Sequence, residues 1–259
     1  MTDTSSVLVT VNNLSLGPFK NFNIEILLNS FTIITGSNKS GKSLLLKVMA
    51  GLINTKKITY NKDVIDSDKD ISYAYNIYFN FDTVIKNLRY PLECLGFDDD
   101  KINKLVRDCA KDLKITKLLN SKIKDLDCYE RVRVYLASLL VSSPKLLLLD
   151  DIGLYLSPLE KEDLMGILEQ LRSMGITIIL TTSSLEEAIY TINSTIYVLD
   201  NGSIVCQGET LDVLANDSLL NKVGLELPFM VDLSVKLEYY GLISKINMSP
   251  LGLVESLWK

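Results

Sequence analysis

The sequence is poor in several features that direct protein function. It contains no histidine, and its glutamines are confined to Gln170 and Gln207. Its net charge is −5, its pI lies near 5.0, and no run of Lys or Arg exceeds two residues. Because nucleic-acid-binding proteins present clustered positive charge, we do not expect nucleic acid as a partner. The four cysteines form no C-x-x-C pair, so we expect reduced, packed thiols.

Long apolar runs are missing as well. No stretch approaches the roughly 18 apolar residues needed to span a bilayer. Residues 1–13 lack the basic and apolar regions of a secretion signal, so we expect a cytoplasmic protein. The 259 residues, of which 47% are hydrophobic, suffice for one α/β domain with an appendage or for two modest domains.

A phosphate-binding motif dominates the first part of the chain. It reads Gly36-Ser37-Asn38-Lys39-Ser40-Gly41-Lys42-Ser43, which matches G-x-x-x-x-G-K-[ST]. The β-branched run before it and the apolar run after it supply the strand and helix that this motif requires, which an ordinary glycine turn would not explain. We predict that residues 36–41 surround nucleotide phosphates with backbone N–H groups. Lys42 is expected to reach the β- and γ-phosphates, and the Ser43 hydroxyl to bind magnesium.

Two carboxylates follow the most apolar strand candidate. Four consecutive leucines, residues 146–149, precede Asp150 and Asp151. Such a run is typical of a strand buried on both faces at the centre of a parallel sheet. A carboxylate at the end of that strand holds magnesium through its water shell in P-loop proteins, which predicts Asp150 as a metal-site residue. Asp151 is a candidate general base for water, unless both residues merely begin a loop.

Hydrophobic periodicity predicts the remaining elements. Strands are expected at 7–11, 22–28, 31–35, 57–60, 71–75, 146–149 and 176–181, and on both sides of the turn 200–202. Helices are expected from the phosphate-binding motif to Gly51, and at 82–94, 101–113, 129–141, 158–172, 185–192 and 228–240. This order predicts an α/β fold with a mainly parallel sheet and N-terminal antiparallel strands. A nucleotide-binding domain would cover 1–217, with a helical subdomain inserted at about 77–143, and a helical C-terminal region would cover 218–259.

The order of P-loop, helical insert and acidic pair resembles the ATPase subunits of ABC transporters over roughly residues 5–215. The resemblance implies the ABC-ATPase variant of the P-loop NTPase fold, ATP and magnesium as cofactors, and a head-to-tail dimer of ATPase subunits. In this family a segment LSGGQ-x-x-R contacts the γ-phosphate held by the other subunit.

The matching segment, 126–133, keeps only the first leucine and the last arginine. Cys128 and Tyr129 replace two glycines, which removes close approach of the backbone. Asp127 either places an anion where a phosphate should dock or is a helix N-cap, and we favour the N-cap. The segment is therefore expected to be disabled as a γ-phosphate sensor.

Four further positions depart from the family. Ser183 stands where the family has a histidine that orients the γ-phosphate and water. Asn76, a predicted nucleotide-site residue, stands at the position of a glutamine, Asp151 replaces a glutamate, and Ser157 replaces an aspartate. Since phosphoryl transfer depends on positioning and charge stabilisation, these losses together predict weak or no hydrolysis at the site of this chain.

Lys39 stands where the family usually has glycine. If this position needs a positive φ, the lysine stores about 1–3 kcal/mol of strain and loosens the cradle. If it does not, the lysine is tolerated and adds a cation near the phosphates. We favour tolerance because the other motif residues are intact.

The C-terminal region narrows the resemblance. Residues 223–237 resemble the G-L-x-x-P-F and helix segment of ATPases from energy-coupling factor (ECF) transporters of vitamins and metal ions, although a simple helical cap would share the periodicity. The resemblance implies a heterodimer with a second ABC ATPase subunit, uptake of a small nutrient, and a peripheral position on the inner face of the cell membrane. It also implies that the helical subdomain, especially 82–95, contacts an integral membrane subunit.

Two other functions stay open. The first is a non-hydrolytic nucleotide-binding scaffold or regulatory module in a membrane complex. The second is a DNA-repair or chromosome ATPase, which the absence of a long coiled-coil insertion and of basic patches disfavours.

Overall fold

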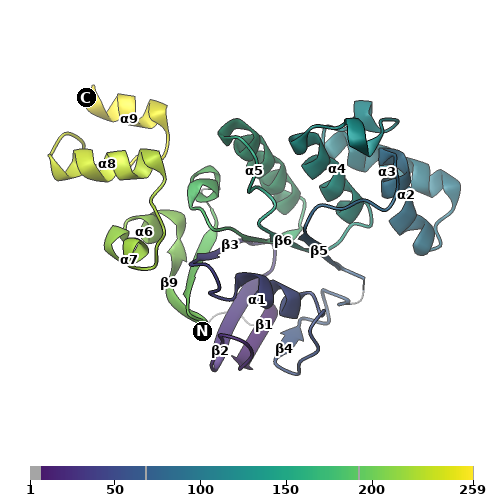
Figure 1. The fold of residues 1–259 in the computed structure, drawn as a ribbon, viewed down its shortest axis with the longest axis horizontal. Coiled ribbons are helices and arrows are strands. Elements are labelled where there is room, and N and C mark those ends of the chain that lie inside the picture. The colour runs from purple at the N-terminus through teal and green to yellow at the C-terminus, as the bar shows by residue number, and fades with distance from the viewer. Residues whose placement is uncertain (1–6, 68, 192, 259) are drawn as a thin grey trace.

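The computed structural model describes residues 7–67, 69–191 and 193–258, and these form two sheets (Figure 1). The larger sheet has the strand order β5-β6-β7-β3-β8-β9 and is parallel except for β9. Its strands are β3 (Phe31–Gly36), β5 (Ile71–Tyr75), β6 (Leu146–Asp150), β7 (Thr177–Thr181), β8 (Thr195–Asp200) and β9 (Ser203–Glu209). The smaller sheet is antiparallel, in the order β2 (Phe22–Leu27), β1 (Val7–Leu14) and β4 (Ile58–Tyr60). The predicted sheet arrangement is thereby confirmed.

Helices cover both faces of the larger sheet and extend beyond it. They are α1 (Lys42–Met49), α2 (Val84–Cys94), α3 (Asp99–Asp112), α4 (Cys128–Leu140), α5 (Pro158–Ser173), α6 (Thr210–Leu214), α7 (Asp217–Lys222), α8 (Phe229–Tyr239) and α9 (Pro250–Leu257). The inserted helices α2, α3 and α4 lie at one end of the long axis, and α8 and α9 lie at the other (Figure 1). No helix in the described parts of the chain is both long and apolar enough to cross a membrane.

The central strand β6 divides the core into two clusters. Its leucines, 146–149, are all fully buried, which confirms a strand covered on both faces. Because successive side chains of a strand point to opposite faces, Leu147 and Leu149 pack with the inserted helices and α5. Leu146 and Leu148 pack on the other side, with α1 and the antiparallel sheet. The strand end that carries the carboxylates is therefore held rigidly from two sides.

One predicted helix is wrong. The sequence predicts an α-helix over 185–192, but the structure has a short 3₁₀-helix, η4 (Glu186–Tyr190), and residue 192 lies outside the described residues. Ser184 Oγ accepts a hydrogen bond from the Glu186 N–H (3.1 Å), and Thr191 Oγ1 donates to the Ala188 carbonyl (3.3 Å). Serine and threonine hydroxyls that bond the backbone compete with helical hydrogen bonds, so the polar flanks limit this segment to a short turn.

Candidate nucleotide-binding site

Strand register brings the predicted site residues to one edge of the sheet. Thr181 of β7 lies opposite Asp150 of β6, which in turn lies opposite Tyr75 of β5. On the other side of β7, Ile34 of β3 lies opposite Thr181. Parallel strands share their carboxyl edge, where ligands bind in open α/β sheets. The predicted site residues that end or follow these strands therefore lie along this one edge: Gly36, Asn76, Asp151 and Ser183.

Two glycines of the phosphate-binding loop are required by close packing. Gly36 has a φ of 146°, and a Cβ there would lie 1.9 Å from the Leu199 carbonyl oxygen. Gly41 has a φ of 110°, and a Cβ there would lie 2.5 Å from the Phe19 ring. No side chain fits at either position without a shift of its surroundings. The loop backbone therefore runs closer to its neighbours than any other residue type would allow.

Lys39 adopts a left-handed backbone conformation with a φ of 66°. The favoured interpretation, that this position does not need a positive φ, is therefore wrong. A residue with a Cβ is strained in this region, at a cost of about 1–2 kcal/mol. The lysine is held there because the loop on both sides is fixed by its neighbours.

The turn between β8 and β9 supports the loop from outside the motif. The Ser37 hydroxyl donates a hydrogen bond to the Asp200 carboxylate (2.9 Å), and the Gly202 N–H donates to the Ser40 carbonyl oxygen (3.2 Å). A cleft of about 330 Å³ lies along the loop. It is lined by Pro18, Asn38, Lys39, Ser40, Gly41, Lys42, Ser43, Leu44 and Asp151. Asp151 is thus the acidic wall of a cleft whose other residues come from the loop, from Pro18 before it, and from the start of α1.

Lys42 lies between the loop and the two carboxylates. Its side chain is only 8% exposed, and its Nζ donates to the carbonyl oxygens of Gly36 (2.7 Å) and Ser37 (3.2 Å). Burial lowers the pKa of Lys42, while the negative charges of Asp151 and Asp150 oppose that shift. The ammonium group is thus partly desolvated, which strengthens its attraction for an anion in the cleft.

Asp150 is held by three hydroxyl groups from three elements. Its Oδ1 accepts hydrogen bonds from Ser43 Oγ (3.0 Å) and Thr181 Oγ1 (2.6 Å), and its Oδ2 accepts one from the Tyr73 hydroxyl (3.1 Å). The two predicted metal-site residues are therefore in contact. Both groups present oxygen atoms, the ligand type that magnesium prefers, and these two oxygens lie 3.0 Å apart. The pair thus fits the prediction that Ser43 would bind magnesium and that Asp150 would hold it through its water shell.

Asp151 and Ser183 are also brought together. Asp151 has a φ of 51°, and its Oδ1 accepts hydrogen bonds from the Ser183 N–H (3.2 Å) and from the Ser183 hydroxyl (3.4 Å). Burial raises the pKa of Asp151, as does the charge of Asp150, while Lys42 and the Ser183 hydrogen bonds oppose the rise. Ser183 therefore acts as a donor toward Asp151. Unlike the ring nitrogen of a histidine, its hydroxyl does not take up a proton at neutral pH.

Asn76 lies at the rim of the site. It follows β5 in a left-handed conformation with a φ of 47°, and it is exposed. Its side chain makes no hydrogen bond within the described parts of the chain, so its role toward a nucleotide stays a prediction.

The start of α4 is a capped helix end, as favoured from the sequence. Asp127 accepts a hydrogen bond from the Glu130 N–H (2.7 Å), and Glu130 accepts one from the Asp127 N–H (3.1 Å), which forms a complete capping box. The next residues are tied down as well, because the buried Tyr129 donates to Asp163 of α5 (2.7 Å). Ser157 forms a second capping box at the start of α5. Both residues have a structural use that needs no nucleotide.

Sequence reasoning missed two residues of the site, Tyr73 and Thr181. Both are hydroxyl-bearing residues on strands that flank β6, and both bond Asp150. The sequence signal that could have indicated them is a hydroxyl near the carboxyl end of a strand that is predicted to lie beside β6. It becomes specific only once the strand order is known.

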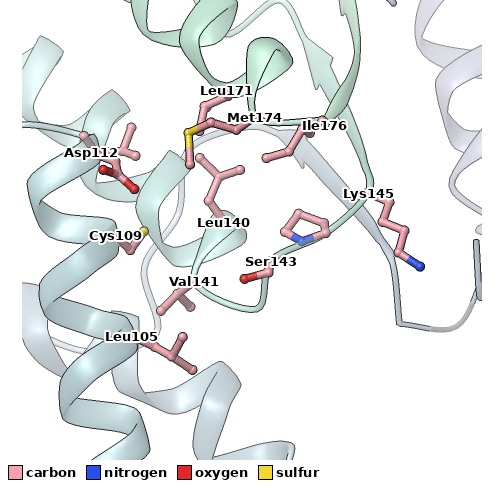
Figure 2. Close-up of a pocket in the computed structure, with 13 residues that line it drawn as sticks. Leu105, Cys109, Asp112, Leu140, Val141, Ser143, Lys145, Leu171, Met174 and Ile176 are labelled. Carbon is pink, nitrogen blue, oxygen red and sulfur yellow. The ribbon is translucent and has the colours of Figure 1, made fainter. Parts of the chain in front are cut away.

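A second hollow, of about 340 Å³, lies away from the nucleotide cleft (Figure 2). It is bounded by α3, by the loop after α4 and by the C-terminal end of α5. Its walls are mainly apolar, including Leu105, Leu140 and Met174, and none of the predicted site residues lines it. Cys109 also lines it, and burial, assisted by Asp112, raises the pKa of that thiol to about 12. Its thiol is therefore protonated at neutral pH and is a weak nucleophile.

The fold and site define a P-loop nucleotide-binding domain. A glycine loop lies against a helix start, a buried strand of the same sheet ends in aspartate beside the first turn of that helix, and helices are inserted between the two motifs. A family model described as "ABC transporter" matches residues 19–152, and the chain belongs to this family of ATPase domains. The resemblance stated from the sequence is thereby confirmed.

Similar proteins carry a narrower name. The chain is 28% identical over 254 residues to "Energy-coupling factor transporter ATP-binding protein EcfA1" of Mycoplasma pneumoniae, covering 93% of this chain and 90% of that protein. It is 29% identical over 221 residues to "Energy-coupling factor transporter ATP-binding protein EcfA" of Pediococcus pentosaceus, covering 81% and 78%. The structure of cbiO1 from Clostridium perfringens, described as part of the ABC transporter complex cbiONQ, superposes with a TM-score of 0.74. At 23% identity over 85% of this chain and 95% of that one, this likeness shows the fold alone.

Proposed function

We propose that the chain is the ATP-binding subunit of an ECF-type ABC transporter and that it pairs with a second ATPase subunit in a heterodimer. The pair would energise uptake of a small nutrient such as a vitamin or a metal ion. The names of the relatives support the ECF assignment. The site of this chain would bind ATP with magnesium and hydrolyse it weakly or not at all.

Support for nucleotide binding comes from the contact between Ser43 and Asp150 beside the buried Lys42. Backbone N–H groups of the loop and the Lys42 ammonium would hold the phosphates, and Ser43 and Asp150 would hold magnesium. When bound, magnesium supplies positive charge that screens the phosphate oxygens. These groups need no movement of the sheet, because the strands that carry them are packed on both faces.

The contact between Asp151 and Ser183 carries the proposal of weak hydrolysis. Asp151 is one methylene shorter than the usual glutamate, and one of its oxygens already accepts from Ser183. Neither residue offers an imidazole to orient water and phosphate together. Because phosphoryl transfer depends on such orientation, a site that keeps only its binding groups should hold ATP far longer than it cleaves it.

Hydrolysis by the isolated chain and by the co-purified pair tests this proposal. We expect ATP binding by both, turnover by the pair, and little turnover by the chain alone. A partner variant that lacks its own P-loop lysine serves as the matched control, since it isolates the site of this chain within the pair. Brisk turnover by the isolated chain would contradict the weak-hydrolysis claim without affecting the assignment of the family.

The helical subdomain offers a groove for the membrane subunit. A hollow of about 620 Å³ is bounded on one side by residues 77–82, which follow β5, and on the other by Lys122, Lys124 and Arg131. Tyr78 is 58% exposed there. We propose that an apolar helix of the membrane subunit, which carries acidic residues opposite these cations, docks in this groove. This docking would hold the chain at the inner face of the membrane. Reversing the charge of Lys122 and Lys124 should abolish co-purification of that subunit, whereas reversing Lys117, outside the groove, should not.

A static nucleotide scaffold is the second candidate function. The contact between Asp151 and Ser183 favours it, because these two residues bond each other and neither offers an imidazole to orient water. In that case Lys42→Ala would leave transport and assembly unchanged. Loss of transport in that variant, with assembly intact, would favour the ATPase-subunit proposal instead.

A further inference from the structure

The carboxylate of Asp150 has different partners on its two oxygens. Oδ1 accepts from Ser43 and Thr181, next to the phosphate-binding loop, and Oδ2 accepts from the Tyr73 hydroxyl (3.1 Å). A carboxylate can rotate about its bond to Cβ unless both oxygens are held. We propose that Tyr73 is a positioning residue for the magnesium site: its hydroxyl fixes the rotation of the Asp150 carboxylate and so keeps Oδ1 beside Ser43.

Strand geometry places the Tyr73 hydroxyl at this point. Tyr73 lies opposite Leu148, and Tyr75, two residues later, lies opposite Asp150. Side chains two residues apart in a strand share a face, so both tyrosines and Asp150 lie on the same side of the sheet. The tyrosine rings stack in parallel, with centroids 5.7 Å apart and planes at 6°.

The ring of Tyr73 is itself held in place. It packs against the core cluster that contains Leu146 and Leu148, beneath α1. Stacking on Tyr75 limits rotation of the ring from the other side. A hydroxyl on an immobilised ring is a fixed donor, whereas a donor on a flexible side chain loses entropy whenever it forms its bond. Tyr73 can therefore hold Asp150 without further ordering.

The Tyr73 hydroxyl keeps its proton. Burial raises the pKa of Tyr73, and the charge and hydrogen bond of Asp150 raise it further, so the group is a neutral donor at every physiological pH. A neutral donor orients the carboxylate without cancelling its charge, unlike a lysine or arginine at the same place.

The test replaces Tyr73 with phenylalanine, which keeps the ring and removes the donor. Tyr75→Phe is the matched control, because Tyr75 lies on the same strand and face without bonding Asp150. ATP affinity is measured by calorimetry in EDTA and across a magnesium titration, and melting temperature is recorded for every variant. We expect Tyr73→Phe to raise the magnesium concentration for half-maximal enhancement of ATP affinity about fivefold to tenfold, which is the net effect of one typical hydrogen bond. Affinity in EDTA should change less than twofold, and Tyr75→Phe should change neither quantity.

Two results would overturn the proposal. One is an unchanged magnesium requirement in Tyr73→Phe. The other is an equal loss of affinity in EDTA, which would mean that the hydroxyl supports the cleft as a whole. A second measurement compares Asp150→Asn with the double variant Tyr73→Phe and Asp150→Asn, and it stays valid if Tyr73→Phe alone is destabilised. Once the carboxylate is gone, adding Tyr73→Phe should not change the magnesium dependence further.

The inference rests on the nucleotide-binding part of the proposed function, and the same experiment separates the two. If the unmodified protein shows no magnesium-dependent ATP binding, the proposed function fails. If the unmodified protein binds and Tyr73→Phe behaves identically, only the role of Tyr73 fails.

Discussion

The phosphate-binding side of the cleft and the side expected to orient water differ in how their groups are held. On the first side, Asp150 accepts three hydroxyl bonds from three elements, and Lys42 is 8% exposed between two loop carbonyls and two carboxylates. On the second side, the described residues give Asp151 one hydrogen-bonding partner, Ser183, over 3.2 and 3.4 Å. The same sheet edge thus presents a tightly constrained half and a loosely constrained half. Binding and turnover can therefore be separated by single substitutions.

Removing the cation of the constrained half should have the largest effect. Lys42→Ala is expected to weaken magnesium-ATP binding about 100-fold or more, because a partly desolvated ammonium contact to phosphate is lost. Lys47→Ala is the matched control on the same helix; its ammonium lies 5.5 Å from the centre of the Tyr75 ring. Calorimetry should show less than a twofold change in that variant. Equal losses in both would mean that the helix, and not the Lys42 charge, determines binding.

The loosely constrained half depends on a buried ion pair behind it. Lys161 of α5 contacts Glu187 of η4 at 2.9 Å, with side chains only 15% and 5% exposed, and Thr182 also donates to Glu187 (3.1 Å). Glu187→Gln should lower the free energy of unfolding by about 3 kcal/mol, because Lys161 would keep a buried charge without a counter-charge. Urea unfolding measures the change.

Glu186→Gln is the control for that variant, since the carboxylate of Glu186 accepts a long hydrogen bond, from the Phe229 N–H at 3.3 Å. We expect it to lose less than about 1 kcal/mol. A similar small loss in Glu187→Gln would show that the ion pair does not support the loop that carries Ser183.

Restoring the missing groups should narrow the difference between the halves. The double variant Asp151→Glu with Ser183→His is expected to raise turnover in the pair about tenfold. An oriented acid or base contributes about 100-fold or more when it is fully positioned, but Asn76 still stands in place of the family's glutamine. A matched control moves the histidine by one residue, as Asp151→Glu with Ser184→His. If the two double variants hydrolyse ATP at the same rate, the position of Ser183 is not what limits turnover.

Relieving strain in the loop should have a smaller effect. Lys39 has a φ of 66°, which glycine adopts without cost, so Lys39→Gly should stabilise the fold by about 1 kcal/mol. Asn38→Gly is the control, because Asn38 is not among the residues with positive φ, and glycine there adds only unfolded-state entropy. Urea unfolding of both variants decides the matter: a gain in Asn38→Gly, or none in Lys39→Gly, contradicts a strained Lys39.

The smallest expected effect is a change in pH dependence. The pKa of Asp151 lies above its ordinary value of 3.8, so the folded protein binds more protons than the unfolded chain between 3.8 and the raised value. Stability attributable to Asp151 therefore falls as pH rises through that window. Asp151→Asn should remove this decrease of stability with rising pH. The free energy of unfolding, measured from pH 3 to pH 7, detects the change.

Asp163 provides the opposite case within the same chain. Hydrogen bonds from Lys114 and Tyr129 lower the pKa of Asp163, so its contribution is present at higher pH and is lost as pH falls. Asp163→Asn should therefore reduce the loss of stability on acidification. If both variants shift the profile in the same direction, the assignment of opposite pKa shifts is wrong.

Much of the fold follows from local patterns, whereas the contacts that arrange the site do not. The four leucines of β6 predicted a central strand, and the sequence from Asp127 to Glu130 allowed an N-cap to be favoured. The positive φ of Lys39 could not be predicted, because it depends on the loop as a whole. The segment 185–192 was misjudged because its hydrophobic period is helical and its flanking hydroxyls act on the backbone.

Contacts between distant residues were beyond reach for a different reason. Tyr73 meets Asp150 only because β5 and β6 are neighbours in a particular register, and Lys161 meets Glu187 only because α5 packs on η4. Strand order and register are decided by the whole core. A single sequence indicates which residues carry chemistry, but the partners of those residues emerge with the fold.

The support of the phosphate-binding loop by the turn after β8 has a consequence for synthesis of the chain. Ser37 needs Asp200, and the Ser40 carbonyl oxygen needs the Gly202 N–H, so more than 160 residues separate each pair. A ribosome delivers the loop early and its supports late, roughly 8–30 seconds apart at about 5–20 residues per second. The nucleotide cradle is therefore among the last parts of the domain to acquire its final shape. A nascent chain acquires its full ability to retain nucleotide only when the sheet is nearly complete.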